Sequence, residues 1–284
     1  MSAEYVDLHT HSTASDGTCS PRELAQLAKS SHLVGFALTD HDTVAGVREA
    51  ADEARTLGLE FIPGIEISAA YPRPGTMHLL GYCVDPDSAA LAQLSQWQIE
   101  SRNQRNLKLI ARLRELGVAI TLEEVQEAAG GDVIGRPHIA EVLVRKGYVS
   151  SAHQAFEKYV APGGLAYVDR ERLAPRRAIE LIRDSGGIPV LAHPVQLRTE
   201  NDAQLQRVVK DLVDLGLAGL EVIHSDHNRE LVEKYTKLAD RYGLVKTGGS
   251  DFHGAKKAGI ELGIAGGQRV PRAFLDNLLA HSRR

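Results

Sequence analysis

The sequence is poor in cysteine and has no long apolar run. Cys19 and Cys83 are the two cysteines among 284 residues, and they do not form a Cys-x-x-Cys pair. Disulfide bonds are therefore excluded as the main source of stability, and a reducing, cytoplasmic environment is expected. No apolar run reaches the ~18 residues of a membrane span, and no basic-then-apolar signal precedes the first strand-like run. We expect a protein that is neither secreted nor inserted in a membrane.

The sequence also lacks a strong excess of charge of one sign. It has 33 Lys and Arg residues against 37 Asp and Glu residues, which gives a formal net charge of −4. A broad basic surface for duplex nucleic acid is therefore not expected, whereas a small nucleotide or a short single strand remains compatible with a local pocket. Nothing in the composition implies a protein partner.

Short apolar runs alternate with helical patterns over most of the chain. Strand-like runs cover 5–9, 34–39, 60–67, 77–82, 188–192, 219–223 and 245–249, with 262–265 as a further candidate, and helical patterns cover 21–30, 44–57, 175–185, 203–215 and 229–242. This alternation is typical of a parallel sheet built from βα units. The length suits a single α/β barrel.

One region interrupts the alternation. Helical patterns at 91–116, 122–129, 136–146 and 152–159 follow one another without a strand-like run. Such a stretch is too long for an ordinary βα connection. We predict a helical subdomain at 88–160, inserted over the mouth of a barrel formed by 1–87 and 161–284.

Histidine and aspartate gather directly after the apolar runs. The clusters have the sequences HTH at 9–11, SDG at 15–17, TDHD at 39–42 and SDFH at 250–253. His9 and His11 are two positions apart on an extended segment, so both side chains point to the same side and can share one metal ion. The carboxyl ends of barrel strands meet on one face, where clusters distant in sequence come together. The sequence therefore predicts a multinuclear metal hydrolase.

These motifs resemble the PHP family, named after polymerase and histidinol phosphatase. The matching segments are DLHTHS at 7–12, SDG at 15–17, TDHD at 39–42, GIE at 64–66, His78, AHP at 192–194 and SDFH at 250–253. The resemblance covers essentially the whole chain. It implies an α/β fold, a distorted (β/α)7-type PHP barrel with the inserted helical subdomain. Within the family the chain is most similar to stand-alone phosphoesterases that remove the 3′-phosphate of nucleoside 3′,5′-bisphosphates, some of whose relatives also degrade short 5′-phosphorylated RNA.

The resemblance also implies a set of metal ligands. His9, His11, Glu66 and Asp251 would hold one ion; Glu66 would bridge to a second ion held by His78 and His193; Asp16, His41 and His253 would hold a third. Two or three divalent ions are implied, manganese first, with iron or zinc as alternatives, because imidazole and carboxylate ligands suit all three. On residue pattern alone His78 is the weakest of these, since it begins an apolar run instead of ending one.

The implied reaction is attack of a metal-bound hydroxide on phosphorus. His227 is the candidate general acid, and Asp40 is expected to orient a ligand imidazole. The candidate substrate-binding residues are Arg136, His138, Lys158 and His227. The residue pattern alone leaves Arg136 open between a phosphate clamp, which suits its planar guanidinium, and a surface position at a helix start.

Two other enzyme classes are alternatives. Histidinol-phosphate hydrolysis uses the same chemistry, although the insertion carrying Arg136 favours the nucleotide branch. A metal-dependent amidohydrolase would also have His-x-His on its first barrel strand, but many binuclear members bridge their ions with a carboxylated lysine. Glu66 takes that place here, and Lys246 is the one lysine near a strand end. A non-catalytic scaffold is disfavoured because every ligand position is retained.

Overall fold

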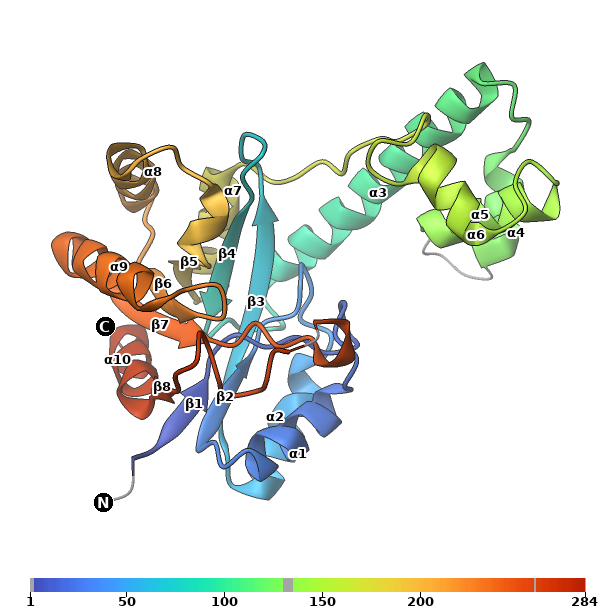
Figure 1. The fold of residues 1–284 in the computed structure, drawn as a ribbon. Helices are drawn as coiled ribbons and strands as arrows, with labels where there is room; N and C mark the ends of the chain where they lie inside the picture. Colours follow the sequence, from blue (N-terminus) through green and yellow to red (C-terminus); the bar gives the residue numbers. More distant parts are fainter. Residues whose placement is uncertain (1–2, 130–134, 258, 284) are drawn as a thin grey trace. The chain divides into compact units, whose positions relative to one another are not determined.

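The computed structural model describes residues 3–129, 135–257 and 259–283. The chain divides into two compact units. The first consists of Met1–Leu94 together with Arg172–Arg284, and the second is Ser95–Glu171. Figure 1 shows the elements of both units in chain order.

The first unit is built on an eight-stranded sheet. Its strands are β1 (Tyr5–Asp7), β2 (Gly35–Leu38), β3 (Glu60–Ala69), β4 (Met77–Tyr82), β5 (Ile188–Leu191), β6 (Gly219–His224), β7 (Val245–Gly249) and β8 (Val270–Pro271). They are paired in the order β7-β6-β5-β4-β3-β2-β1-β8. The Leu8 N–H donates to the Gly248 carbonyl at 3.1 Å and the Asp251 N–H donates to the His9 carbonyl at 2.9 Å. These bonds join the β1 and β7 ends, so the sheet nearly closes, and the predicted α/β barrel is confirmed.

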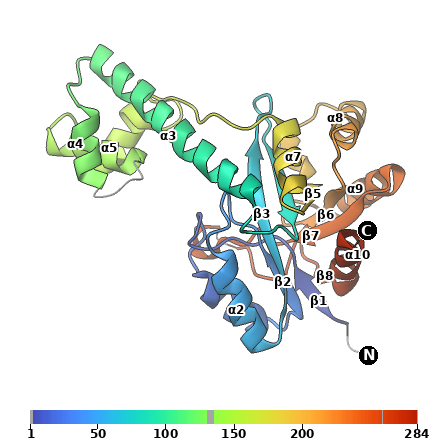
Figure 2. The same cartoon turned by 180° about the vertical axis from the view of Figure 1, so that it is seen from behind.

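Helices cover the outside of this barrel. They are α1 (Pro21–Ser30), α2 (Val47–Leu57), α7 (Pro175–Asp184), α8 (Asp202–Asp214), α9 (Arg229–Tyr242) and α10 (Arg272–Ser282). In α1 the Ser20 side chain accepts from the Glu23 N–H, the Glu23 carboxylate accepts from the Ser20 N–H, and Pro21 occupies the first turn. This capping box fixes the helix start. Viewed from behind, α7 lies beside β4 and β5, as its contacts require (Figure 2).

Two strand predictions were wrong. The strand β4 runs antiparallel to both of its neighbours, with Ser68 opposite His78 in the β3–β4 pair. The short connection between β3 and β4 explains this, because it allows a hairpin but not the crossover that a parallel strand needs. The run 262–265 does not form a named strand; β8 pairs instead with β1, also antiparallel.

The second unit is helical and has its own core. Its elements are most of α3 (Ala89–Glu115), then α4 (Leu122–Ala129), α5 (Arg136–Arg145), α6 (Ala152–Ala155) and a π-helical turn (Phe156–Val160). Leu109, Leu113, Ile139, Leu143 and Val160 are among the buried residues that pack together. The predicted helical patterns of this region are therefore confirmed. Within the described ranges, none of the helices is both long and apolar enough to cross a bilayer.

Candidate metal centre

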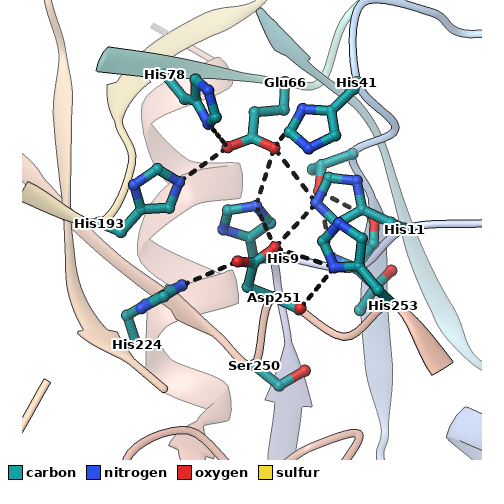
Figure 3. A network of polar contacts seen from close by, with 12 residues as sticks. His9, His11, His41, Glu66, His78, His193, His224, Ser250, Asp251 and His253 are labelled. Carbon is teal, nitrogen blue, oxygen red and sulfur yellow. Dashed lines mark hydrogen bonds and ion pairs between the residues drawn. The ribbon is translucent and has the colours of Figure 1, made fainter. Parts of the chain in front are cut away.

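Imidazole and carboxylate groups from seven strands meet at one end of the barrel (Figure 3). His9 and His11 follow β1, His41 follows β2, Glu66 lies in β3, His78 begins β4, His193 follows β5, His224 ends β6, and Asp251 and His253 follow β7. His78 reaches this end because β4 is antiparallel, so the start of β4 lies beside the carboxyl-terminal part of β3. The direction of one strand thus explains the position that had made His78 the weakest candidate.

The backbone ties these segments together. Thr10 pairs with Phe252, and His41 pairs with Glu66, each through an isolated parallel β-bridge of the backbone. The Glu66 N–H donates to the Asp40 carbonyl at 3.1 Å. Asp251 has a φ of 56° and His193 a φ of 21°, a region that residues other than glycine rarely adopt. Such backbone strain is typical of functional sites.

The first group of side chains consists of His9, His11, Glu66 and Asp251. One ligand atom from each lies within 4.8 Å of the others, and all four residues are buried. His9 Nε2 lies 3.4 Å from Glu66 Oε2, and His11 Nε2 lies 3.1 Å from Asp251 Oδ1. This is the same set of residues that the sequence motifs imply for one ion.

Glu66 links this group to a second one. Its Oε1 lies 2.9 Å from His78 Nδ1 and 3.0 Å from His193 Nε2. Its Oε2 lies 2.9 Å from His41 Nδ1. The two carboxylate oxygens therefore face different imidazoles, as a bridging ligand requires.

The third group consists of His11, Asp16, His41 and His253, again with ligand atoms within 4.8 Å of one another. His253 Nε2 lies 3.2 Å from Asp16 Oδ1. Asp16 is half exposed at the edge of the centre. The structure thus brings together all nine residues named as ligands: His9, His11, Asp16, His41, Glu66, His78, His193, Asp251 and His253.

The donor set fits divalent cations. His9 Nε2, His11 Nε2 and Glu66 Oε2 are buried and make no well-aligned hydrogen bond, although both imidazole nitrogens lie 3.3–3.4 Å from this oxygen. Buried polar atoms without partners are costly, and a cation among these three atoms would satisfy all of them at once. Mixed nitrogen and oxygen ligands suit manganese, iron and zinc.

The charges of the cluster are strongly coupled. Burial raises the pKa of Glu66, but His41, His78 and His9 outweigh it and hold that pKa well below 4.5. Burial lowers the pKa of His9, yet Glu221, Glu66 and Asp251 together raise it well above 6.5. The pKa of His41 is raised to about 9, because Glu66 outweighs the effect of burial. Without cations the carboxylates hold protons on the neighbouring imidazoles, so metal binding must release protons.

Glu221, in the middle of β6, was missed by the sequence analysis. It is fully buried; its Oε1 lies 2.9 Å from His9 Nδ1, and its Oε2 accepts the His193 N–H at 2.7 Å. Burial opposes ionisation, but His9 and His224 lower the pKa of Glu221 to about 2. The ionised carboxylate therefore accepts a hydrogen bond from the His9 Nδ1–H and leaves Nε2 free to bind a metal. An acidic residue inside the apolar run 219–223 was the available signal.

His224 supports the centre from the same strand. Its Nδ1 accepts the Asp226 N–H at 3.0 Å, so in the neutral ring the proton is on Nε2, which lies 3.4 Å from Asp251 Oδ2. His9, Glu221 and His224 also form a group whose atoms lie within 4.8 Å. In this tautomer His224 orients Asp251 and has no free nitrogen for an ion.

Asp40 and Asp7 hold the loops that carry the ligands. Asp40 accepts from the Ser12 N–H at 2.7 Å, the Ser12 hydroxyl at 2.6 Å and the Ser15 hydroxyl at 2.5 Å. Asp7 accepts in the same way from the Ser250 N–H at 2.9 Å and the Ser250 hydroxyl at 2.6 Å. These hydrogen bonds of Asp40 fix the loop before Asp16. A role of Asp40 in turnover stays a prediction, and it would act through this loop.

The rings of His227 and His224 are neighbours, with their centroids 5.3 Å apart. Its Nδ1 donates to the Val222 carbonyl at 3.0 Å, and its buried Nε2 has no hydrogen-bond partner. Burial and the charge of His224 lower the pKa of His227 to about 4. His227 is therefore neutral at pH 7 in the free protein, and its role as general acid stays a prediction.

The remaining predicted substrate residues lie in the second unit. Arg136 donates to the Val160 carbonyl at 3.4 Å and lies 6.0 Å from the ring centroid of Tyr167. His138 Nδ1 accepts the Gly135 N–H at 3.2 Å, and Lys158 Nζ lies 4.9 Å from the ring centroid of Tyr159.

Arg105 was not identified from the sequence and belongs to the same group of cations. Burial, together with the charges of Arg136 and Arg102, lowers the pKa of Arg105 to about 10, and its Nε is buried without a partner. Guanidinium groups that raise one another's energy in this way favour an anion.

Known proteins with similar sequences support this chemistry. A 3′,5′-nucleoside bisphosphate phosphatase of Chromobacterium violaceum is 33% identical, covering 91% of this chain and 90% of the relative. A phosphoribosyl 1,2-cyclic phosphate 1,2-diphosphodiesterase of Eggerthella lenta is 34% identical, over 87% and 94%. A 5′-3′ exoribonuclease of Haemophilus influenzae is also 34% identical, over 89% and 91%.

A solved structure has the same fold. A protein of Bifidobacterium adolescentis, described as a metal-dependent phosphoesterase, superposes with a TM-score of 0.72 at 31% identity, covering 98% of this chain and 96% of its own. The family model of the PHP domain matches residues 7–245, which include seven of the nine clustered side chains of the three groups. The match also includes Glu221 and His224 on β6, and it ends at the first residue of β7, before Asp251 and His253. The chain therefore belongs to the PHP domain family and is a metal-dependent hydrolase of phosphoesters.

Proposed function

We propose that this protein binds two or three divalent cations, manganese first, and removes the 3′-phosphate of nucleoside 3′,5′-bisphosphates. One observation carries the proposal. Three overlapping groups of imidazole and carboxylate ligands share His11, Glu66 and His41 at one end of the barrel, and several of their ligand atoms are buried without a partner. Glu66 belongs to two of these groups and would contribute a ligand to both.

The net charge of such a centre favours an anionic substrate. Three divalent ions facing the carboxylates of Asp16, Glu66 and Asp251 leave roughly three positive charges, which a phosphate ester neutralises. When bound, the ions would lower the pKa of a water that attacks phosphorus and would stabilise the charge on the phosphoryl oxygens. Glu221 would keep His9 in the tautomer that binds metal, and Asp40 would keep the Asp16 loop in place.

The leaving oxygen of the substrate needs a proton donor. His227 is the proposed general acid, but its pKa of about 4 leaves it neutral in the free protein. For this role the substrate must raise that pKa, which a phosphate dianion near Nε2 would do by its charge.

We propose that cations of the helical unit take part in substrate binding. Arg136 and Arg105 form the cationic group described above, with Lys158 and His138 as further candidates. Because the relatives include a 5′-3′ exoribonuclease and a phosphoribosyl cyclic phosphate diphosphodiesterase, RNA and a cyclic phosphodiester are the competing substrates, and a short 5′-phosphorylated RNA represents the first of them. Histidinol phosphate and simple amides test the remaining alternatives. We place the protein in the cytoplasm, in keeping with its two free cysteines.

A phosphate-release assay on the manganese-loaded protein tests the proposal. The panel contains a nucleoside 3′,5′-bisphosphate, a short 5′-phosphorylated RNA, a ribose cyclic phosphodiester, histidinol phosphate and a simple amide. We expect the highest kcat/KM for the bisphosphate and no turnover after metal removal with a chelator. Hydrolysis of the amide without hydrolysis of any phosphoester would refute the proposed function.

The same assay tests the cationic group. Arg136→Ala should raise KM for the bisphosphate about tenfold or more, because a charge-assisted hydrogen bond to phosphate is lost, and leave KM for a simple aryl phosphate nearly unchanged. Arg145→Ala on the same helix is the matched control, since Arg145 is exposed and contacts Glu124 and Glu127. Equal effects of Arg136→Ala on both substrates would remove Arg136 from the substrate site.

A further inference from the structure

The ammonium group of a lysine forms an ion pair with one carboxylate oxygen of the metal centre. Lys257 lies on the loop after His253, and its Nζ is 2.5 Å from Asp251 Oδ2. The side chain of Asp251 is 5% exposed, whereas that of Lys257 is 39% exposed. The carboxylate is thus held inside the centre, while the lysine reaches it from the solvent side.

The two oxygens of Asp251 face different surroundings. Oδ1 lies 3.1 Å from His11 Nε2 and 3.4 Å from His253 Nδ1, among the ligand imidazoles. Oδ2 lies near Lys257 and 3.4 Å from His224 Nε2. A cation bound through Oδ1 would therefore share this carboxylate with the ammonium group on Oδ2.

This pair differs from the surface ion pairs of the barrel. Lys210 and Asp214, for example, are each 59% exposed, and pairs of that kind contribute little. At Asp251 the low exposure weakens screening by water. A divalent ion and an ammonium group within a few ångströms of the same buried carboxylate therefore repel each other strongly.

We propose that Lys257 exchanges partners during the reaction cycle. In the ion-free protein it neutralises Asp251, and once ions are bound it moves to the phosphate group of the substrate. The inference rests on the proposed function, because it requires ions at Asp251 and a phosphate ester as ligand. The flexible, solvent-accessible side chain permits the movement, and the charge of the ions and of the phosphate drives it. No covalent bond is made or broken in this exchange.

The exchange has a signature that a purely structural role would not produce. Removing the ammonium group takes away a competitor of the ions and should tighten metal binding. The same change takes away a partner of phosphate and should weaken phosphate binding. If Lys257 only supported the loop, its removal would weaken both.

The experiment compares Lys257→Met with Lys256→Met, because Lys256 is the exposed neighbour in the 3-10 turn Gly254–Lys256. Mn²⁺ binding to the metal-free full-length protein and inorganic phosphate binding to the manganese-loaded protein are measured by titration calorimetry. For Lys257→Met we expect the Kd for Mn²⁺ to fall about tenfold and the Kd for phosphate to rise about tenfold. Lys256→Met should behave like the parent, and Lys257→Arg should stay within about threefold of it.

Unchanged or weaker Mn²⁺ binding by Lys257→Met would overturn the inference, as would unchanged phosphate binding. If the parent protein binds Mn²⁺ and hydrolyses phosphoesters in either of these cases, the proposed function stands without Lys257. A parent protein that binds no divalent ion would overturn the proposed function and this inference together.

Discussion

Glu221→Gln offers the sharpest test of how the barrel prepares its metal ligands. The carboxylate is fully buried and has two partners, the Nδ1 of His9 at 2.9 Å and the backbone N–H of His193 at 2.7 Å. A carboxylate accepts from both. A glutamine amide has one oxygen and one NH₂ group, so it can accept from only one of them.

The expected magnitudes follow from this loss. If the amide NH₂ faces His9, Nδ1 must accept and the proton moves to Nε2, the atom that the ion needs. If it faces His193, two N–H donors oppose each other. Loss of such an orienting carboxylate costs about 10- to 100-fold in metal affinity. In the metal-free protein, the lowering of the Glu221 pKa from 4.5 to about 2 corresponds to a stabilisation of about 3 kcal/mol at neutral pH, which the uncharged amide cannot supply.

Two measurements test the expected losses of metal affinity and of stability. Titration calorimetry gives the Kd for Mn²⁺, and urea unfolding of the metal-free protein at pH 7 gives the free energy of unfolding. Glu230→Gln is the control, because Glu230 is an exposed glutamate at the start of α9. A Glu221→Gln protein whose Mn²⁺ affinity stays within about twofold of the parent would refute the argument that Glu221 sets the His9 tautomer.

Two other substitutions test the surroundings of the centre. His227 has its pKa lowered from 6.5 to about 4 by burial and His224, so the folded state favours the neutral ring. Stability is therefore fully present above pH 6.5 and is lost as the pH falls towards 4. The metal-free parent should lose unfolding free energy between pH 7 and pH 5, and His227→Gln should make this loss smaller by about 2 kcal/mol. Equal losses in parent and variant would contradict the lowered pKa of His227. A Cβ at Gly249 would lie 2.3 Å from the backbone nitrogen of His9 and 2.5 Å from the His9 Cβ. Gly249→Ala should destabilise the metal-free protein by about 1–3 kcal/mol, measured by thermal unfolding, and weaken Mn²⁺ binding, measured by calorimetry. Parent-like values would mean that the backbone between β1 and β7 shifts without cost to make room for the methyl group.

Most helices and strands were predictable because their signals are local. The capping box of Ser20 and Glu23, the proline at the start of α1 and the left-handed Gly58 after α2 each act within a few residues of the chain. Helices such as 122–129 and 229–242 begin and end where their patterns predict. The residues predicted as ligands, which the structure brings together, were indicated for a related reason, since the family motifs are short and keep their residue types.

The direction of β4 had a local signal in the short connection after β3, which allows only a hairpin, and this direction decides that His78 faces Glu66. The partner of His9 had no comparable local signal. Glu221 is 212 positions from His9 in the sequence, and nothing near either residue indicates the pairing. Lys257 is close to Asp251 in sequence, but only the turn after His253 directs its ammonium group to the buried carboxylate.

The sequence by itself determined the residue types of the centre, the elements that carry them and the family to which they belong. The tertiary structure decided which groups face one another, which nitrogen of His9 and of His224 is engaged by a neighbour, and which charges are buried together. The physical reason is that hydrogen bonds and charge interactions act over a few ångströms in space, and only the closure of the sheet between β1 and β7 brings segments from both ends of the chain within that distance.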